Sequence, residues 1–305
     1  MYNSFNRAMK KRFGCKIYKL ALSGGMTCPT RDGTLGTRGC IFCSTKGSGE
    51  FAAKPCESIA KQIENAKALV ASKAKDAKYI AYFQDYTNTY APVERLRELF
   101  TQAMAPEDVV ALSVATRPDC LPDDVVELLA ELNKQKPVFI ELGLQTIHES
   151  TAEYIRRGYK LNVFENAVTK LKAAGIEIIV HIIIGLPYET EDMIYETVKY
   201  LADVKADGVK LQLLHVLEGT DLAEEYRQGK FDVLNMDKYI DILENCVRLL
   251  PPDTVIHRLT GDGTKKDLIA PLWSADKKNV LNTINRRFKE DNVRQGELYL
   301  THRSS

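Results

Sequence analysis

Short apolar runs alternate with amphipathic segments along most of this chain. The apolar runs predict strands at 16–22, 78–84, 109–116, 138–145, 176–185 and 208–216. The run IEIIVHIIIG at 176–185 is almost continuously apolar, which is typical of a parallel strand covered on both faces. Between the runs, apolar residues spaced three and four positions apart predict helices.

The helices are expected from one-sided apolar faces and from capping residues. A helix over 57–72 places Ile59 and Ile63 on one face, and another helix begins near Val93. Asp123 is expected to cap the helix after the third strand, and Asn162 the helix after the fourth.

Strands that alternate with helices indicate an α/β fold with a parallel sheet. Right-handed crossovers would curl this sheet into a partial (β/α)6 TIM-like barrel over 16–220. Residues 1–15 then form a basic N-terminal segment, and 221–305 form a C-terminal extension packing on the barrel. In such barrels the chemistry lies where the carboxyl ends of the strands meet the loops.

Length and composition narrow the setting. The 305 residues are 45% hydrophobic, enough for a large core, and no run of about 18 apolar residues predicts a membrane span. The first residues lack the apolar segment of a secretory signal. We therefore expect a cytoplasmic protein with no membrane partner, in which clustered thiols stay reduced and more often bind metal than form disulfides.

Charge is distributed unevenly. Residues 1–20 carry six bases and no acid, residues 277–303 carry a net charge of +4, and the rest of the chain is acidic. Basic ends on an acidic body indicate either a polyanionic partner or two solvated termini, and charge alone does not separate these. If the partner is a nucleic acid, Arg7, Lys10, Lys11 and Arg12 are the expected phosphate contacts, at termini free to border the barrel mouth.

The segment CPTRDGTLGTRGCIFC, after the first strand, holds three of the seven cysteines: Cys28, Cys40 and Cys43. A structural zinc site wants four protein ligands, and this loop contains no histidine. An iron–sulfur cube normally takes four thiolates, so three would leave one iron open to a cofactor or substrate. The alternative is a reduced loop whose thiols are close by coincidence.

This loop resembles that of the radical S-adenosylmethionine (SAM) enzymes, in the branch of the YhcC/YtqA-type proteins and the catalytic subunit of Elongator. The resemblance covers nearly the whole chain. Its segments are YNSFN, KLALSGGMTCPTRDG, GCIFC, GSGEF, YFQDYTNTYAP, ATRPDCLPDDV, ELGLQT, IRRGY, HIIIGLP, LLHVLEGT and LIAPLW. Thr30 and Tyr159 depart from the common pattern of this branch, but neither is a thiol.

The resemblance implies that Cys28, Cys40 and Cys43 hold a [4Fe-4S] cluster. SAM would chelate the fourth iron, and an electron from a donor such as flavodoxin or ferredoxin would release a 5′-deoxyadenosyl radical. A SAM site is implied at Phe42, Gln84, Tyr86, Thr87, Gln145, Arg157, His181 and Gly185. For Arg157 the alternative is a solvated base at a helix end, and for His181 a satisfied core group.

Catalytic residues beyond the cofactors are unknown, with Cys120 and His215 as weak candidates. Three functions remain open. The first is a radical SAM enzyme that modifies the wobble uridine of tRNA, the second one that acts on a small molecule or a protein, and the third a metal- or cluster-binding scaffold without turnover.

Overall fold

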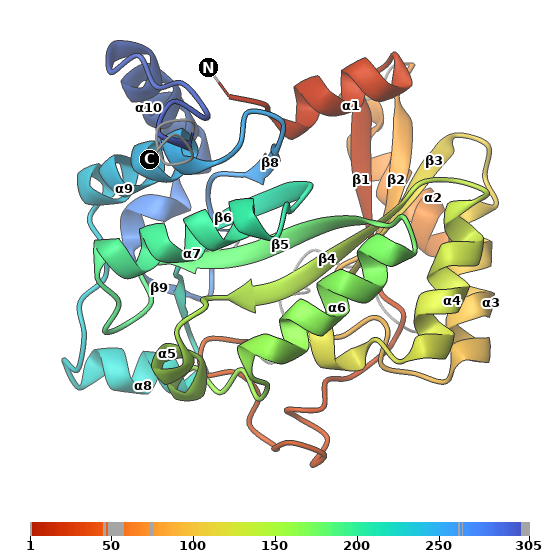
Figure 1. Cartoon of the computed structure of the whole chain (residues 1–305), viewed down its shortest axis with the longest axis horizontal. Helices are drawn as coiled ribbons and strands as arrows, with labels where there is room; N and C mark the ends of the chain where they lie inside the picture. The colour runs from red at the N-terminus through yellow and green to blue at the C-terminus, as the bar shows by residue number, and fades with distance from the viewer. Residues whose placement is uncertain are drawn as a thin grey trace.

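The computed structural model describes residues 2–44, 47, 58–73, 76–261, 263 and 265–299. Its centre is one curled sheet with helices packed on its outer side (Figure 1). Cys56, which has no partner thiol at metal-binding spacing and is therefore expected to be structural, lies outside the described residues, as does the end of the basic segment 277–303. None of the helices in the described ranges is long and apolar enough to cross a membrane.

Seven parallel strands form the sheet, in the order β1-β2-β3-β4-β5-β6-β8. Their bounds are β1 Ile17–Leu22, β2 Lys78–Phe83, β3 Val109–Thr116, β4 Val138–Gln145, β5 Glu177–Ile184, β6 Gly208–Leu213 and β8 Val255–Arg258. The predicted partial barrel is confirmed, with one strand more than expected. The sequence did not reveal β8 because four residues are too short for a periodic signal.

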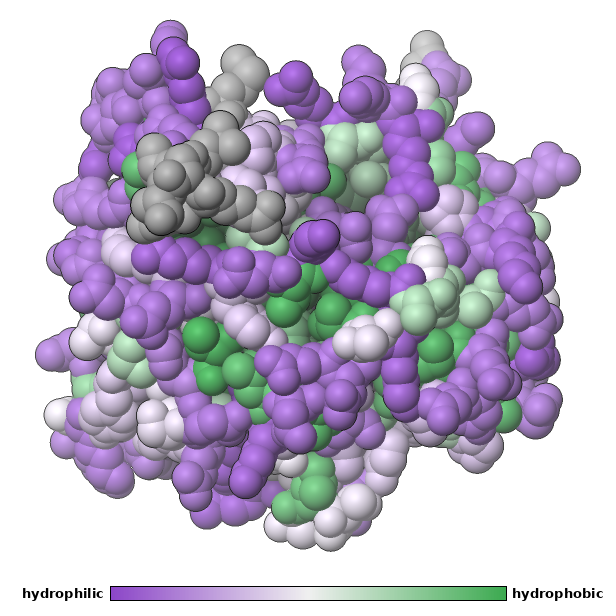
Figure 2. Space-filling model, viewed as in Figure 1, coloured by the Kyte–Doolittle hydropathy of each residue, from purple (hydrophilic) through white to green (hydrophobic). Residues whose placement is uncertain are grey.

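The larger helices cover the outer face of the sheet. They are α2 Ile59–Val70, α3 Val93–Met104, α4 Asp123–Asn133, α6 Leu161–Ala173 and α7 Glu191–Asp203. On α3, for example, Leu96, Leu99 and Phe100 are buried against the strands, as their spacing predicts. In Figure 2 this side of the molecule is mostly hydrophilic, with apolar atoms showing in the band between α6 and α7.

The predicted caps were wrong by one or two residues. Asp123 is the first residue of α4, after Pro122 at the N-cap, and α6 begins at Leu161 after Lys160. Proline suits this position because its φ is already set and it has no N–H to lose.

The remaining elements are α5 Glu149–Tyr154, α8 Asp221–Arg227, α9 Met236–Leu249, α10 Lys277–Glu290, a β7 Val216–Leu217 to β9 Leu268–Ala270 ladder, and 3-10 turns at Ala71–Lys73, Pro118–Cys120 and Leu272–Ala275.

Helix α1 (Phe5–Phe13) closes the end of the barrel where the strands begin (Figure 1). Its buried Met9 packs with Ile17 and Phe139, which stand near the starts of β1 and β4. Because the strands are parallel, the cysteine loop after β1 lies at the other end. The expectation that the N-terminal basic segment borders the barrel mouth was therefore wrong: the amphipathic face of α1 is used to cover the barrel's base.

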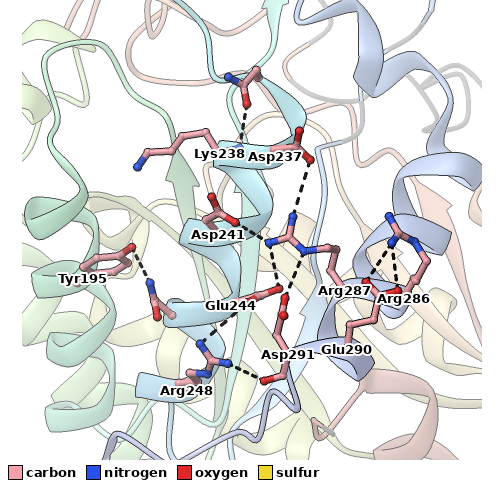
Figure 3. Close-up of polar contacts among 12 residues, drawn as sticks. Tyr195, Asp237, Lys238, Asp241, Glu244, Arg248, Arg286, Arg287, Glu290 and Asp291 are labelled. Atoms are coloured by element: carbon pink, nitrogen blue, oxygen red, sulfur yellow. Dashed lines mark hydrogen bonds and ion pairs between the residues drawn. The ribbon is translucent and has the colours of Figure 1, made fainter.

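The two basic ends of the chain meet each other. The ring of Tyr2 packs edge-on against Phe288 of α10 at 5.9 Å between centroids, and Asn3 N donates to Gln295 Oε1 at 2.8 Å. Much of the positive charge of α10 is already paired: Arg287 bonds Asp241 of α9 at 2.7 Å (Figure 3). The start of the chain thus packs against α10, and both basic helices, α1 and α10, lie away from the cysteine loop (Figure 1).

Candidate functional site

A cavity of about 220 Å³ opens among the loops at the carboxyl ends of the strands. All three loop cysteines line it: Cys28, Cys40 and Cys43. So do eight other predicted site residues, namely Phe42, Gln84, Tyr86, Thr87, Gln145, Arg157, His181 and His215. Residues from six separate loops and strands are brought together here, as the barrel topology requires.

The cysteine loop is folded by its own backbone. Cys28 O accepts the N–H groups of Arg31 at 2.8 Å and Asp32 at 3.2 Å, and Cys43 N donates to Cys40 O at 3.0 Å. Gly39 takes a φ of +74° and donates its N–H to the Thr30 carbonyl at 2.8 Å, a conformation that favours glycine. The two turns hold the thiols on one side of the loop, toward the cavity.

Arg31 fastens the end of this loop. Its Nη2 donates to the Cys43 carbonyl at 2.9 Å and the Ser44 carbonyl at 2.7 Å. A Cβ at Gly39 would lie 2.8 Å from this guanidinium, so glycine is needed there for space as well as for φ. Sequence reasoning missed Arg31, although its position inside the cysteine motif was a signal.

Two guanidinium groups counter the burial of the thiols. Burial, with a smaller contribution from the neighbouring Cys43, raises the pKa of Cys40 to about 12, although Arg117 and Arg31 act in the opposite direction. Arg117, from the TRPDC segment, is itself held by Asp119 at 2.7 Å. The two guanidinium groups offset the negative charge of deprotonated thiols. They therefore favour the thiolate form, which is the form that binds a metal.

Several buried polar atoms that face this cavity have no hydrogen-bond partner among the residues that the structure describes. They are Thr87 Oγ1, Gln145 Oε1 and Arg157 Nη2. Buried polar atoms normally find partners, so orphans grouped around one cavity indicate a polar ligand. Gln145 also has a φ of +69°, and Tyr86 one of +50°, conformations that non-glycine residues rarely adopt. Local strain of this kind concentrates at functional sites.

Arg157 is buried, with 2% of its surface exposed, so the alternative of a solvated helix-end base was wrong. Its guanidinium donates to the carbonyls of Thr146 at 2.6 Å and Tyr159 at 3.1 Å and lies 4.6 Å from the Tyr159 ring centroid. Nη2 lies 3.6 Å from the half-exposed Glu149 carboxylate, a distance too long for a hydrogen bond. Arg157 therefore supports the β4 loop and keeps one nitrogen for a ligand.

Below the thiols, the floor of the cavity is a network centred on Glu141 of β4, which is fully buried. Its carboxylate accepts from Lys19 of β1 at 2.5 Å, Ser113 of β3 at 2.8 Å and His181 of β5 at 2.7 Å, and it also bonds Lys210 of β6. These cations and the histidine hold the pKa of Glu141 well below its ordinary value despite its burial.

His181 therefore belongs to this network. Burial, together with the charge of Lys210, lowers the pKa of His181 to about 4, so the ring is neutral near pH 7. With Glu141 ionised, Nε2 carries the proton that it donates. The sequence could not show this network, because its members come from separate strands, and only His181 was singled out.

Two family models match the chain. The model for the radical SAM superfamily matches residues 34–201, and that for the Radical_SAM C-terminal domain matches residues 206–290. The chain belongs to the radical SAM superfamily. YtqA of Bacillus subtilis strain 168 is 46% identical over 298 residues, which cover 98% of this chain and 92% of YtqA. The resemblance to the YhcC/YtqA-type branch is thereby confirmed.

More distant similarities extend to the Elongator side of the superfamily. A tRNA uridine(34) acetyltransferase of Methanocaldococcus jannaschii is 28% identical over 178 residues, covering 53% of this chain and 32% of that protein. Among solved structures, the Elp3 of Methanocaldococcus infernus with residues 1–46 deleted has a TM-score of 0.69 at 17% identity, covering 92% of this chain and 64% of that one. This structural likeness shows a shared fold.

Membership of the superfamily implies SAM and a [4Fe-4S] cluster in general, and the residues of this radical SAM protein fit them. The donor set is three thiols, flanked by two guanidinium groups and by the orphaned oxygens described above. Within the described ranges, no three His, Cys, Asp or Glu side chains converge on a point that could hold one metal ion. A cube distributes its thiolates over separate iron atoms, so it does not require that convergence.

The glycines around this cavity keep aromatic rings in place. A Cβ at Gly47 would lie 2.4 Å from the Tyr86 ring, and Tyr86 N donates to the Gly47 carbonyl at 2.9 Å. A Cβ at Gly261 would lie 2.7 Å from the His215 ring. A side chain in place of Gly47 would therefore displace the ring of Tyr86, and one in place of Gly261 would displace the ring of His215.

Some predicted residues lie elsewhere. Gly185 does not line the cavity; it packs near Leu234, where a Cβ would come within 3.0 Å of the leucine. Cys120 lies in a separate groove, its pKa raised to about 12 by burial and by Asp119, and its Sγ is 3.8 Å from Asp119 Oδ1. The four cations of α1 are at the opposite end of the barrel.

Proposed function

We propose that this radical SAM protein is an enzyme that modifies the wobble uridine of tRNA, with its cluster held by Cys28, Cys40 and Cys43. The observation that carries the enzymatic part is the convergence of three thiols and several unpartnered polar atoms on one cavity. When bound, the cluster and SAM supply a 5′-deoxyadenosyl radical. The chain's own residues orient the cofactor and exclude water around it.

In this proposal the orphaned side chains bind SAM. Gln145 and Arg157 present an oxygen and a nitrogen from the end of β4 and the turn after α5, and Thr87 presents a hydroxyl after β2. Phe42, between the last two thiols, covers the cluster from solvent. The guanidinium groups of Arg31 and Arg117 stabilise the anionic thiolates.

The choice of tRNA is supported by the similarity to a tRNA uridine(34) acetyltransferase. It is also supported by an aromatic side chain at the mouth: Tyr188, after β5, is 65% exposed, has a φ of +67° and packs edge-on against Tyr154 at 5.2 Å. An exposed aromatic ring of this kind suits stacking on an unpaired base, the usual mode of RNA recognition in loops. The basic side chains of α1 and of α10 would contact phosphates farther along the same tRNA.

The proposal is tested by anaerobic reconstitution followed by two measurements. Reconstituted protein should convert SAM to 5′-deoxyadenosine. It should also bind tRNA with an affinity that falls by about 0.7–0.9 log units per phosphate contact for each tenfold rise in salt concentration. Tyr188→Ala should weaken tRNA binding, by roughly 1–3 kcal/mol for a lost base stack. Neutralising Arg7, Lys10, Lys11 and Arg12 together should reduce the salt slope while SAM cleavage without substrate stays unchanged.

Two outcomes would decide against the proposal. Metal uptake without any 5′-deoxyadenosine would favour a scaffold. Absence of tRNA binding at low salt, with SAM cleavage intact, would favour an enzyme that acts on a small molecule or protein.

The SAM contacts give a prediction of their own. Gln145→Ala should weaken SAM binding roughly tenfold to a hundredfold, since a hydrogen bond to a charged ligand group contributes on the order of 1.5–3 kcal/mol. The thermal stability of Gln145→Ala should change little, because Gln145 Oε1 has no hydrogen-bond partner to lose among the described residues. Arg157→Ala should lose SAM affinity and also stability, because it leaves the carbonyls of Thr146 and Tyr159 without their donor. Calorimetric SAM titration, iron content and melting curves measure these effects; unchanged SAM affinity in both variants contradicts both roles.

A further inference from the structure

The floor of the cavity lies well below the ligands expected at its mouth. Glu141 precedes Gln145 by four residues on β4, a rise of about 13 Å at the usual strand spacing. Lys210 and Arg258 line the same cavity beside Glu141. They stand opposite each other on neighbouring strands, β6 and β8, in register. The cavity therefore runs from the thiols down to a charged floor.

Among the described residues, positive charge exceeds negative charge on this floor. Among the described residues that line the cavity, Glu141 is the only carboxylate. Lys19, just outside the lining, also uses this carboxylate, at 2.5 Å. Two lysines thus share one buried carboxylate. Buried cations without enough counter-charge are costly, so the floor favours a second anion.

Lys210 is the cation with bonding capacity left. It is 3% exposed and donates to the hydroxyl of Tyr82 at 2.9 Å and to Glu141. An ammonium group has three N–H donors, and the third has no acceptor in the part of the chain that the structure describes. Burial lowers the pKa of Lys210 to about 7; Glu141 opposes this effect, and Lys19 and Arg258 add to it.

Small residues keep the space above Lys210 open. Ala115 of β3 and Gly143 of β4 line the wall between the floor and the mouth. A Cβ at Gly143 would already lie 2.9 Å from Gln145 Nε2, so a larger residue would press on the proposed SAM contact. The third N–H of Lys210 and the adjacent Arg258 guanidinium suit a compact group with two acceptor oxygens. A phosphate is bulkier and carries three acceptor oxygens, so it fits this space less well.

We propose that the floor binds a carboxylate group of the molecule on which the enzyme acts, with Lys210 as its anchor and Arg258 beside it. This inference rests on the proposed function, which makes the cavity the substrate site. The carboxylate belongs either to a substituent on the target uridine or to a small free acid used as co-substrate. Both sources present a carboxylate, and they differ in the molecule that carries it.

The test is a set of calorimetric titrations of the anaerobically reconstituted protein without SAM. The probes are 5-carboxyuridine, its neutral analogue uridine-5-carboxamide, acetate and succinate. We expect 5-carboxyuridine to bind at least tenfold more tightly than the carboxamide if the carboxylate is carried on the base. Tighter binding of acetate or succinate than of 5-carboxyuridine identifies a free acid. Saturable binding of none of the three carboxylates overturns the inference.

The matched variants are Lys210→Met and Lys19→Met. Each removes one lysine from the same Glu141 carboxylate, but only Lys210 lines the cavity. Lys210→Met should weaken the tightest carboxylate at least tenfold and leave carboxamide binding unchanged, whereas Lys19→Met should change carboxylate affinity less than threefold. Equal effects of the two variants, or none, overturn the assignment of Lys210.

A measurement on the unaltered protein covers the case in which Lys210→Met does not fold. Carboxylate affinity should fall about tenfold between pH 6 and pH 8 as Lys210 loses its proton, since a group with a pKa near 7 goes from mostly charged to mostly neutral over that range. The groups that face Lys210 from the packed strands are Lys19 of β1, Tyr82 of β2, Glu141 of β4, His181 of β5, and His257 and Arg258 of β8. His181, with a pKa of about 4, and Glu141, with a lowered pKa, keep one protonation state over this range. A flat profile contradicts the inference.

SAM cleavage measured in the same preparation distinguishes failure of the carboxylate site from failure of the proposed function. If SAM is cleaved and no carboxylate binds, the carboxylate site fails alone. If a carboxylate binds through Lys210 but SAM is never cleaved, the proposed function fails and the site stands.

Discussion

Replacing Cys28, Cys40 or Cys43 with alanine is expected to abolish both the brown chromophore of the reconstituted protein and its cleavage of SAM. A cube held by three protein thiolates has none to spare, and the loss of one leaves a second iron without a protein ligand. Iron and sulfide content, the absorption spectrum and 5′-deoxyadenosine formation measure the effect. Any one of the three substitutions should be sufficient, because all three thiols line the same cavity.

The controls come from cysteines outside the cavity. Cys15 lies beside α1, and Cys246 is buried in α9, where burial raises its pKa. Cys15→Ala and Cys246→Ala should retain iron and SAM cleavage, although Cys246→Ala leaves a small cavity and is expected to lower the melting temperature. Loss of the cluster in Cys15→Ala together with its retention in Cys28→Ala would show that the ligand assignment is wrong.

Glu141→Gln is expected to lower the free energy of unfolding by roughly 3–5 kcal/mol, the cost of removing one partner from a buried ion pair. The glutamine keeps the size of the side chain but leaves the buried Lys210 and the part-buried Lys19 without this carboxylate. Urea denaturation of anaerobically prepared protein measures the difference. Adding Lys210→Met to Glu141→Gln should recover part of the loss, because the double variant no longer contains the buried unpaired ammonium.

The matched control is Glu177→Gln. Glu177 bonds Arg12 at 2.5 Å, as short as the contact between Glu141 and Lys19, but both side chains are more than a third exposed. An exposed pair contributes about 0–1 kcal/mol, so this variant should be close to the unaltered protein. Equal losses in Glu141→Gln and Glu177→Gln would contradict the view that burial makes the Glu141 network important.

Much of the fold could be predicted from local patterns. The apolar runs at 109–116 and 138–145 coincide with β3 and β4, since a buried parallel strand must be apolar on both faces. The loop with Cys28, Cys40 and Cys43 was placed at the barrel mouth because a loop that follows a parallel strand always emerges at the carboxyl edge. These conclusions need only the order of elements along the chain.

What the order of elements could not supply was the partner of each side chain. Glu141 looked like one polar residue in a strand, and its network depends on the register of six strands and on which side chains point inward. For Arg157 the sequence left open a SAM contact or a solvated base at a helix end, and the fold buries it against the carbonyls of the β4 loop. Cys120 follows β3 closely in sequence but faces a different groove.

The sequence by itself determined the α/β class and the places of most strands and helices, because these follow from periodicity. It also indicated the family, through motifs that resemble those of the family in the same order along the chain. The tertiary structure decided that α1 covers the base of the barrel rather than its mouth, that β8 completes the sheet, and that Lys210 meets Glu141 at the floor of the cavity. The physical reason is that these contacts join residues far apart in the chain. They depend on strand register and on side-chain direction, and a linear pattern does not contain either.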